Sequence, residues 1–215
     1  MKNTTEMLFS DFLVQYPQLE SCSEEIKEAF VLINESYKSG GKMLVCGNGG
    51  SASDAEHIAG ELMNKFRMKR PVPLSVKQKL ETFGFENSQY LWTSLQQPLC
   101  AISLVSQTSL TTAIANDIDP DMVFAQQVYG YGKCGDILLA LSTSGNSPNV
   151  LNAVKIARML DMVIVGFTGE TGGKLKSHCQ CTIMVPESKT YKIQELHLPV
   201  YHVLCAMLEQ EFFGQ

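Results

Sequence analysis

Five short apolar runs alternate along the chain with longer segments in which apolar residues recur at helical spacing. The runs show no alternation of polar and apolar residues, which is typical of strands that helices bury on both faces. They cover residues 43–46, 101–105, 137–141, 163–167 and 181–185. The helical segments cover residues 52–67, 107–131 with a break near Pro120, 147–160 and 192–213. This order predicts a three-layer α/β/α fold with a mostly parallel, doubly wound sheet of the flavodoxin-like kind.

The first 40 residues carry a helical pattern of their own. Ile26, Phe30, Ile33 and Tyr37 repeat at the spacing of one helix face, and Ser23 stands where an N-cap is expected. No internal repeat or low-complexity tract interrupts the sequence. We therefore expect one domain over residues 1–215, opened by a helical segment at 1–40.

Charge and composition argue against some kinds of binding partner for this protein. The net charge of −5 argues against nucleic-acid binding, and the one basic cluster, residues 65–70, fits a solvated helix end. No apolar run reaches the ~18 residues of a membrane span, and the N-terminus has no signal-peptide pattern. The seven cysteines are odd in number and several lie in apolar runs, as in a reduced protein. We expect a cytoplasmic protein with neither nucleic acid nor a membrane as partner.

Two Gly/Ser-rich loops each follow a predicted strand and open a predicted helix. The first contains Asn48, Gly49, Gly50 and Ser51, and the second covers residues 142–149. Glycine lets a backbone approach a ligand closely, and a helix N-terminus offers free N–H groups to an anion. Neither loop has the lysine of a nucleoside-triphosphate loop, and neither is a dinucleotide fingerprint. Together they predict a site for a phosphate monoester, although each alone would fit an ordinary capped turn.

Two helical segments hold three of the four histidines. His57 and Glu61 are four residues apart and share a helix face, while Gln194, His197 and His202 lie on the last helix. Such a set can surround a divalent metal or act as a general base and acid. A single histidine on an apolar face is more often a core residue, and spacing alone does not choose between His197 and His202.

These residues and their surroundings resemble the SIS (sugar isomerase) family from about residue 20 onward. The motifs are CGNGGSASDAEHIAGEL, AIAND, GDILLALSTSGNSPNV, GFTGETGGKL and KIQELHLPVYH. More narrowly, the chain resembles the members that convert sedoheptulose 7-phosphate to D-glycero-D-manno-heptose 7-phosphate. The resemblance implies an aldose–ketose isomerase with a five-stranded parallel sheet. It also implies a homotetramer, or at least a homodimer, whose active sites lie between subunits.

The resemblance also assigns roles to residues. Glu61 matches the general base and His202 the general acid of an enediol mechanism. Some members bind zinc, one ion per subunit, and the matching ligands are His57, Glu61, Gln194 and His202. The positions expected to bind the sugar phosphate are Asn48, Gly49, Gly50, Ser51, Lys65, Asn116, Asp117, Ser142, Thr143, Ser144, Ser147 and Gln194.

Two departures from the family pattern keep other functions open. Lys65 stands where the family usually has an arginine near the substrate, and residues 72–99 form an insertion before the second strand. We expect this insertion to be a hairpin or short helix that covers the site mouth or a subunit seam, or else a surface decoration. One alternative is an isomerase for another ketose or an amino-sugar phosphate. The other is a non-catalytic SIS tetramer resembling the DnaA initiator-associating protein.

Overall fold

The computed structural model describes residues 1–214 and contains one five-stranded sheet. The strand order is β2-β1-β3-β4-β5, and every pairing is parallel. The bounds are Met43–Cys46 for β1, Ala101–Ser103 for β2, Ile137–Leu141 for β3, Val163–Thr168 for β4 and Cys181–Met184 for β5. The predicted doubly wound sheet is confirmed, and the sheet order reverses between β1 and β3, where ligands bind in such folds.

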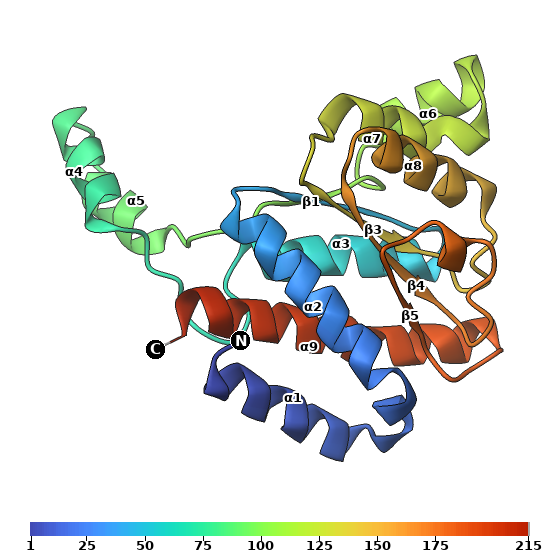
Figure 1. Cartoon of the computed structure of the whole chain (residues 1–215). Helices are drawn as coiled ribbons and strands as arrows, with labels where there is room; N and C mark the ends of the chain where they lie inside the picture. Colours follow the sequence, from blue (N-terminus) through green and yellow to red (C-terminus); the bar gives the residue numbers. More distant parts are fainter. Residues whose placement is uncertain (215) are drawn as a thin grey trace.

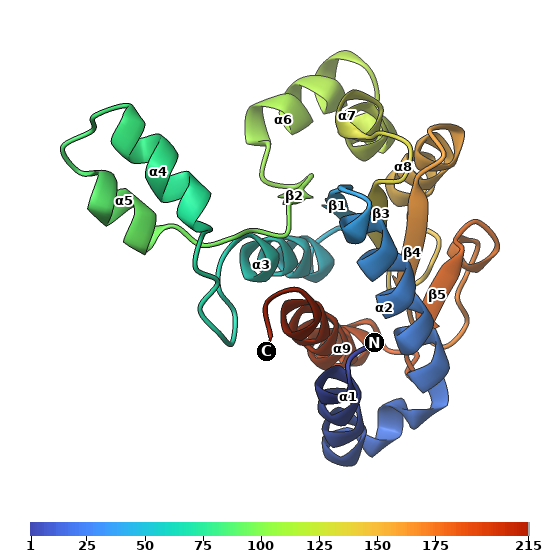
Figure 2. The same ribbon diagram turned by 60° about the vertical axis from the view of Figure 1, so that its left-hand side comes forward.

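Helices cover both faces of the sheet (Figures 1 and 2). One layer contains α1 (Asn3–Gln15), α2 (Ser23–Lys38), α3 (Gly50–Met63) and α9 (Thr190–Phe213), and the other contains α6 (Thr108–Asp117), α7 (Val123–Tyr131) and α8 (Pro148–Met159). Successive residues of β1 alternate between the two apolar cores: Met43 and Val45 pack with the first layer, Leu44 and Cys46 with the second. Short 3₁₀ turns cover Pro17–Cys22, Pro120–Met122 and Leu175–Ser177.

The start of α2 differs in detail from the sequence prediction. Ser23 is the first helical residue and not the N-cap, because the preceding 3₁₀ turn runs directly into the helix. The N-cap position belongs to Cys22, which makes no side-chain cap hydrogen bond. Within residues 1–214, no helix combines the length and the apolar character needed to cross a bilayer.

The insertion at residues 72–99 forms a helical hairpin of α4 (Leu74–Thr82) and α5 (Ser88–Ser94). Neither helix has a buried residue, and the hairpin projects from the body as an arm (Figures 1 and 2). At its base, Pro71 pairs with Gln96 in an antiparallel bridge. The arm lines none of the cavities described below, so in this structure it does not cover a site of its own chain.

Candidate active site

The two Gly/Ser loops meet at the carboxyl edge of the sheet and enclose a cavity of about 350 Å³. The amides of Asn48 and Asn149 exchange hydrogen bonds of 2.9 and 3.0 Å, which tie the first loop to the start of α8. The lining residues are Asn48, Gly49, Gly50, Ser51, Leu141, Ser142, Thr143, Ser147, Thr190 and Gln194. The cavity therefore combines hydroxyl groups, amides and the N-termini of three helices, α3, α8 and α9, without a lysine, as expected for a phosphate monoester held by neutral donors.

Two glycines make the geometry of this cavity possible. Gly49 has a φ of +57°, which lets the chain turn from β1 into α3. A Cβ at Gly50 would lie 2.6 Å from Nε2 of Gln194, so only glycine allows α9 to approach the first turn of α3 this closely. The N-terminal ends of α3 and α9 are thus both at the cavity.

Some hydroxyl groups of the second loop bond within the loop, and those of Ser142, Thr143 and Ser147 belong to residues that line the cavity. The hydroxyls of Ser142 and Ser147 are 3.0 Å apart, and Ser147 is the N-cap residue of α8 without a side-chain cap hydrogen bond. The hydroxyl of Ser144 instead accepts a hydrogen bond from the N–H of Asn146 at 3.2 Å.

Four predicted substrate contacts lie outside the lining of this cavity. Ser144 is exposed on the second loop, and Lys65 is exposed just beyond α3. Asn116 and Asp117 are exposed on α6, where the side-chain amide of Asn116 donates a 2.8 Å hydrogen bond to the carboxylate of Asp117. Their contact with substrate stays a prediction.

The acid–base residues predicted from sequence come together on α3 and α9. His57, Glu61 and His202 each offer an atom within 4.8 Å of the others. Nε2 of His57 lies 3.0 Å from Oε1 of Glu61, and the rings of His57 and His202 meet edge to face with centroids 4.9 Å apart. The two helices run side by side in the same direction, as Figure 1 shows. The structure therefore brings together Glu61 and His202, the residues that the family resemblance implies as general base and general acid, and their catalytic roles stay predictions.

Tyr201 and Asp54, which the sequence analysis did not single out, belong to the surroundings of His57, and Tyr201 contacts its ring. Nδ1 of His57 is 2.9 Å from the hydroxyl of the buried Tyr201. Asp54 lies one turn before His57 on α3; burial raises the pKa of its carboxyl, while Tyr201 and His57 oppose this rise. A metal-binding imidazole needs such a partner on its second nitrogen to fix its tautomer. Tyr201 stands directly before His202, which was the only sequence signal for it.

The environment of His202 suits a neutral imidazole. Burial lowers its pKa, the neighbouring His57 lowers it further, and Glu61 opposes both. Nε2 of His202 is buried and has no hydrogen-bond partner. An orphaned nitrogen lone pair beside a histidine and a glutamate fits a divalent metal such as zinc.

His197 has a structural place instead. It is fully buried, its Nε2 lies 3.2 Å from the carbonyl oxygen of Thr168, and burial lowers its pKa to about 4. The alternative that sequence spacing left open between His197 and His202 is thus decided by geometry in favour of His202.

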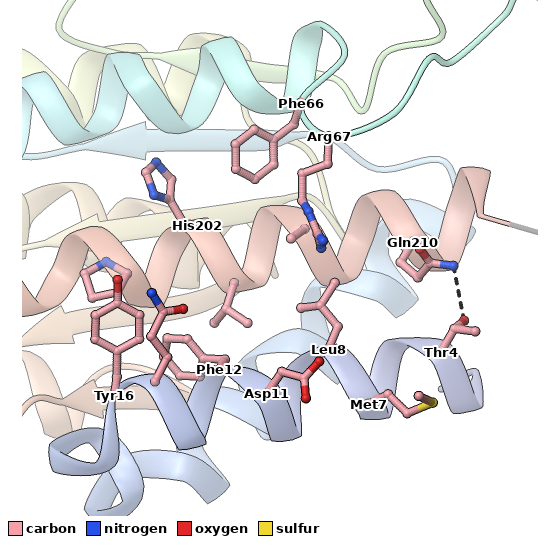
Figure 3. A pocket seen from close by; sticks show the side chains of 14 residues that line it. Thr4, Met7, Leu8, Asp11, Phe12, Tyr16, Phe66, Arg67, His202 and Gln210 are labelled. Carbon is pink, nitrogen blue, oxygen red and sulfur yellow. Dashed lines mark hydrogen bonds between the residues drawn. The ribbon is translucent and has the colours of Figure 1, made fainter.

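His202 also lines a second and larger cavity of about 550 Å³ (Figure 3). This groove lies between α1 and α9, and Phe66 and Arg67 close it on the side of α3. The ring of Phe66 is 5.5 Å from that of His202. The phosphate cavity lies near Gly50, about two helical turns along α3 from His57. Within one chain, His202 therefore opens on a different cavity from the phosphate loops, and Glu61 lines neither cavity.

Fold and site together define a doubly wound α/β domain with a Gly/Ser-lined cavity at the carboxyl edge of its sheet and a Glu/His group on two adjacent helices. The model of the SIS domain family matches residues 15–91 and 93–169. The chain belongs to the SIS domain family.

Within this family the chain is similar to phosphoheptose isomerases. It is 38% identical over 192 residues to that of Rhodospirillum rubrum, covering 89% of this chain and 88% of the relative. It is 40% identical to that of Shewanella denitrificans, covering 91% and 88%. The solved phosphoheptose isomerase of Francisella tularensis superposes with a TM-score of 0.75 at 30% identity, covering 98% of this chain and 100% of that one. The Neisseria gonorrhoeae enzyme gives 0.73 at 32% identity, covering 97% and 98%.

Proposed function

We propose that the protein is an aldose–ketose isomerase that converts sedoheptulose 7-phosphate to D-glycero-D-manno-heptose 7-phosphate. One observation carries this proposal: Glu61 and His202 meet on the helix pair whose N-terminal ends form the phosphate cavity. The similar proteins named phosphoheptose isomerase supply the substrate, since the geometry alone specifies only a phosphate and a proton transfer.

The chemistry needs one carbon-bound proton and one oxygen-bound proton to move. The carboxylate of Glu61 takes the proton from C1 of the ketose, and the C2 carbonyl oxygen receives the proton that leaves O1, which gives a cis-enediolate. His202, neutral because burial lowers its pKa, takes the proton from O1 and supplies the one on O2. Glu61 then returns its proton to C2, which forms the aldose with no net change in protons.

Zinc is the metal that these residues would hold, one ion per subunit. His57, Glu61 and His202 supply a donor set, and Gln194 is the fourth ligand expected from the family. The amide of Gln194 packs against Gly50 in this structure, so its coordination stays a prediction. When bound, zinc would act as a Lewis acid that favours negative charge on the substrate oxygens.

An assembly of subunits would complete the site. Because His202 and the phosphate loops face different cavities of one chain, a second copy would have to supply the part that each cavity lacks. We propose a homotetramer, or at least a homodimer, with sites shared between neighbours. Free thiols at all seven cysteines support a reducing, cytoplasmic location.

A different ketose or amino-sugar phosphate is the second candidate. Lys65 favours it, because an ammonium group lacks the planar fork with which an arginine grips substrate. The non-catalytic alternative is disfavoured by the intact group of His57, Glu61 and His202.

A panel of ketose phosphates tests the proposal. The purified protein should convert sedoheptulose 7-phosphate faster than shorter ketose or amino-sugar phosphates, and a chelator should lower the rate. Metal analysis of the untreated protein should find about one zinc per chain. Faster conversion of another sugar would move the assignment to the second candidate, and conversion of none would leave a binding protein.

A further inference from the structure

Arg70 is the largest fully buried side chain of the described residues, although the sequence placed it in a solvated basic cluster. Its Nε donates a 2.7 Å hydrogen bond to Oε1 of Glu209, and both side chains have no exposed surface. The sequence interpretation of residue 70 was wrong because its partner lies 139 positions later on α9. A buried ion pair is by itself weak evidence for stability, since desolvation of both charges offsets their attraction.

The guanidinium group of Arg70 also holds the end of α3. One terminal nitrogen donates to the carbonyl oxygen of Leu62 at 2.7 Å, and the other donates to that of Glu61 at 2.9 Å. Carbonyls in the last turn of a helix lack partners within the helix, and a positive charge there interacts favourably with the helix dipole. Arg70 therefore bonds directly to the backbone of the proposed catalytic base.

Glu209, the partner of Arg70 on α9, binds the segment that follows α3. Its two carboxylate oxygens accept hydrogen bonds from the N–H groups of Phe66 and Arg67 at 2.9 and 2.7 Å. It follows His202 by two turns on α9, so both residues face the same way. The chain that leaves α3 is thereby tied to the helix that carries the proposed acid.

We propose that Arg70 and Glu209 are positioning residues that set the separation between Glu61 and His202. The inference rests on the proposed function. Arg70 binds the Glu61 backbone, Glu209 shares a helix with His202, and the ion pair joins the two. The phosphate cavity lies at the opposite ends of these helices, beside Gly50 and Gln194. Substitution of Arg70 or Glu209 should therefore affect proton transfer more than phosphate binding.

Arg70→Lys keeps the charge but loses the fork that reaches three acceptors at once. We expect kcat to fall at least about tenfold while KM for the sugar phosphate changes less than about threefold, because phosphate binding is left intact. Arg158→Lys is the matched control, since Arg158 is an exposed arginine in the last turn of α8, and it should leave both constants unchanged.

A double variant separates positioning from folding. Arg70→Met with Glu209→Gln removes both charges and keeps a carbonyl acceptor for the N–H groups of Phe66 and Arg67. It should unfold near the temperature of the unaltered protein, because a neutral replacement of a buried ion pair is often tolerated. Its kcat should nevertheless stay low. Turnover at the original rate in this variant would overturn the inference.

A crystal structure of Arg70→Lys gives a readout that needs no turnover. We expect the side chains of Glu61 and His202 to lie farther apart than in the unaltered protein. An unchanged separation overturns the positioning role whatever the activity. Absence of turnover in the unaltered protein would overturn the proposed function instead, so the two failures are distinguishable.

Discussion

At the scale of single residues, the histidine on α3 has a buried partner on the side away from Glu61. Tyr201 is buried beside His57 and contacts its Nδ1, which leaves Nε2 to face Glu61. In metal sites generally, a histidine ligand makes a hydrogen bond through the ring nitrogen that does not bind the metal, and this bond orients the ring. We therefore expect the hydroxyl of Tyr201 to affect metal binding at His57, although a phenylalanine ring would fill the same space in the core.

Tyr201→Phe tests this role. Loss of the hydroxyl should weaken zinc binding about 10- to 100-fold, because His57 loses the partner that fixes its ring and tautomer. Competition with a chelator measures the affinity. Tyr37→Phe is the control: Tyr37 is also buried, and its hydroxyl donates to the carbonyl oxygen of Cys100. Equal affinities in the Tyr201→Phe variant and the unaltered protein would remove Tyr201 from the site.

His197 predicts how stability depends on pH. Burial lowers its pKa to about 4 in the folded protein from the ordinary histidine value of 6.5, so the unfolded chain binds a proton more readily. The neutral ring contributes its full stability above pH 6.5, and this is lost as the pH falls toward 4. The total loss is about 3 kcal/mol. Denaturant unfolding of His197→Gln at several pH values should lack this component, and parallel curves for both proteins would contradict it.

At the scale of elements, the sequence predicted the strands well because their burial is a local pattern. The apolar runs at β1 and β3 match the observed bounds, and both phosphate loops leave the strands as expected. The placement of Glu61 and His202 on neighbouring helices followed from the family motifs. The burial of Arg70 could not be predicted, because a charged residue is buried only when a distant partner such as Glu209 meets it.

The arm of α4 and α5 is the element least tied to the fold. Its exposed apolar side chains include Phe83, Phe85 and Tyr90, and the ring of Trp92 packs under Lys77. The sequence predicted local helix or hairpin structure there, but not its direction, which depends on where residues 71 and 96 are joined.

Removal of the arm should leave the body intact. Replacement of residues 74–94 by a short Gly/Ser linker should change the unfolding temperature by less than about 2 °C, because neither helix buries a residue. Calorimetry measures this directly. A large loss of stability, or dissociation of an assembly, would show that the arm is buried against another copy.

At the scale of the whole molecule, the phosphate cavity and the His57, Glu61 and His202 group lie about two helical turns apart on α3 and α9. Mixing two inactive variants tests whether subunits share them. Glu61→Gln removes the base, and Thr143→Glu places a negative charge in the phosphate cavity. With random pairing, about a quarter of the shared sites would combine two intact halves, so activity should return. A mixture as inactive as its components would place each site within one chain.

The most direct measurement follows the carbon-bound proton. The protein is incubated with sedoheptulose 7-phosphate in D₂O and the products are followed by NMR, beside Glu61→Gln and the control Glu56→Gln, an exposed carboxylate on the same helix. The unaltered protein and the control should form the aldose with deuterium on carbon, while Glu61→Gln should be slower by several orders of magnitude and still fold. Near-normal turnover in Glu61→Gln, or no aldose from the unaltered protein, would contradict the account.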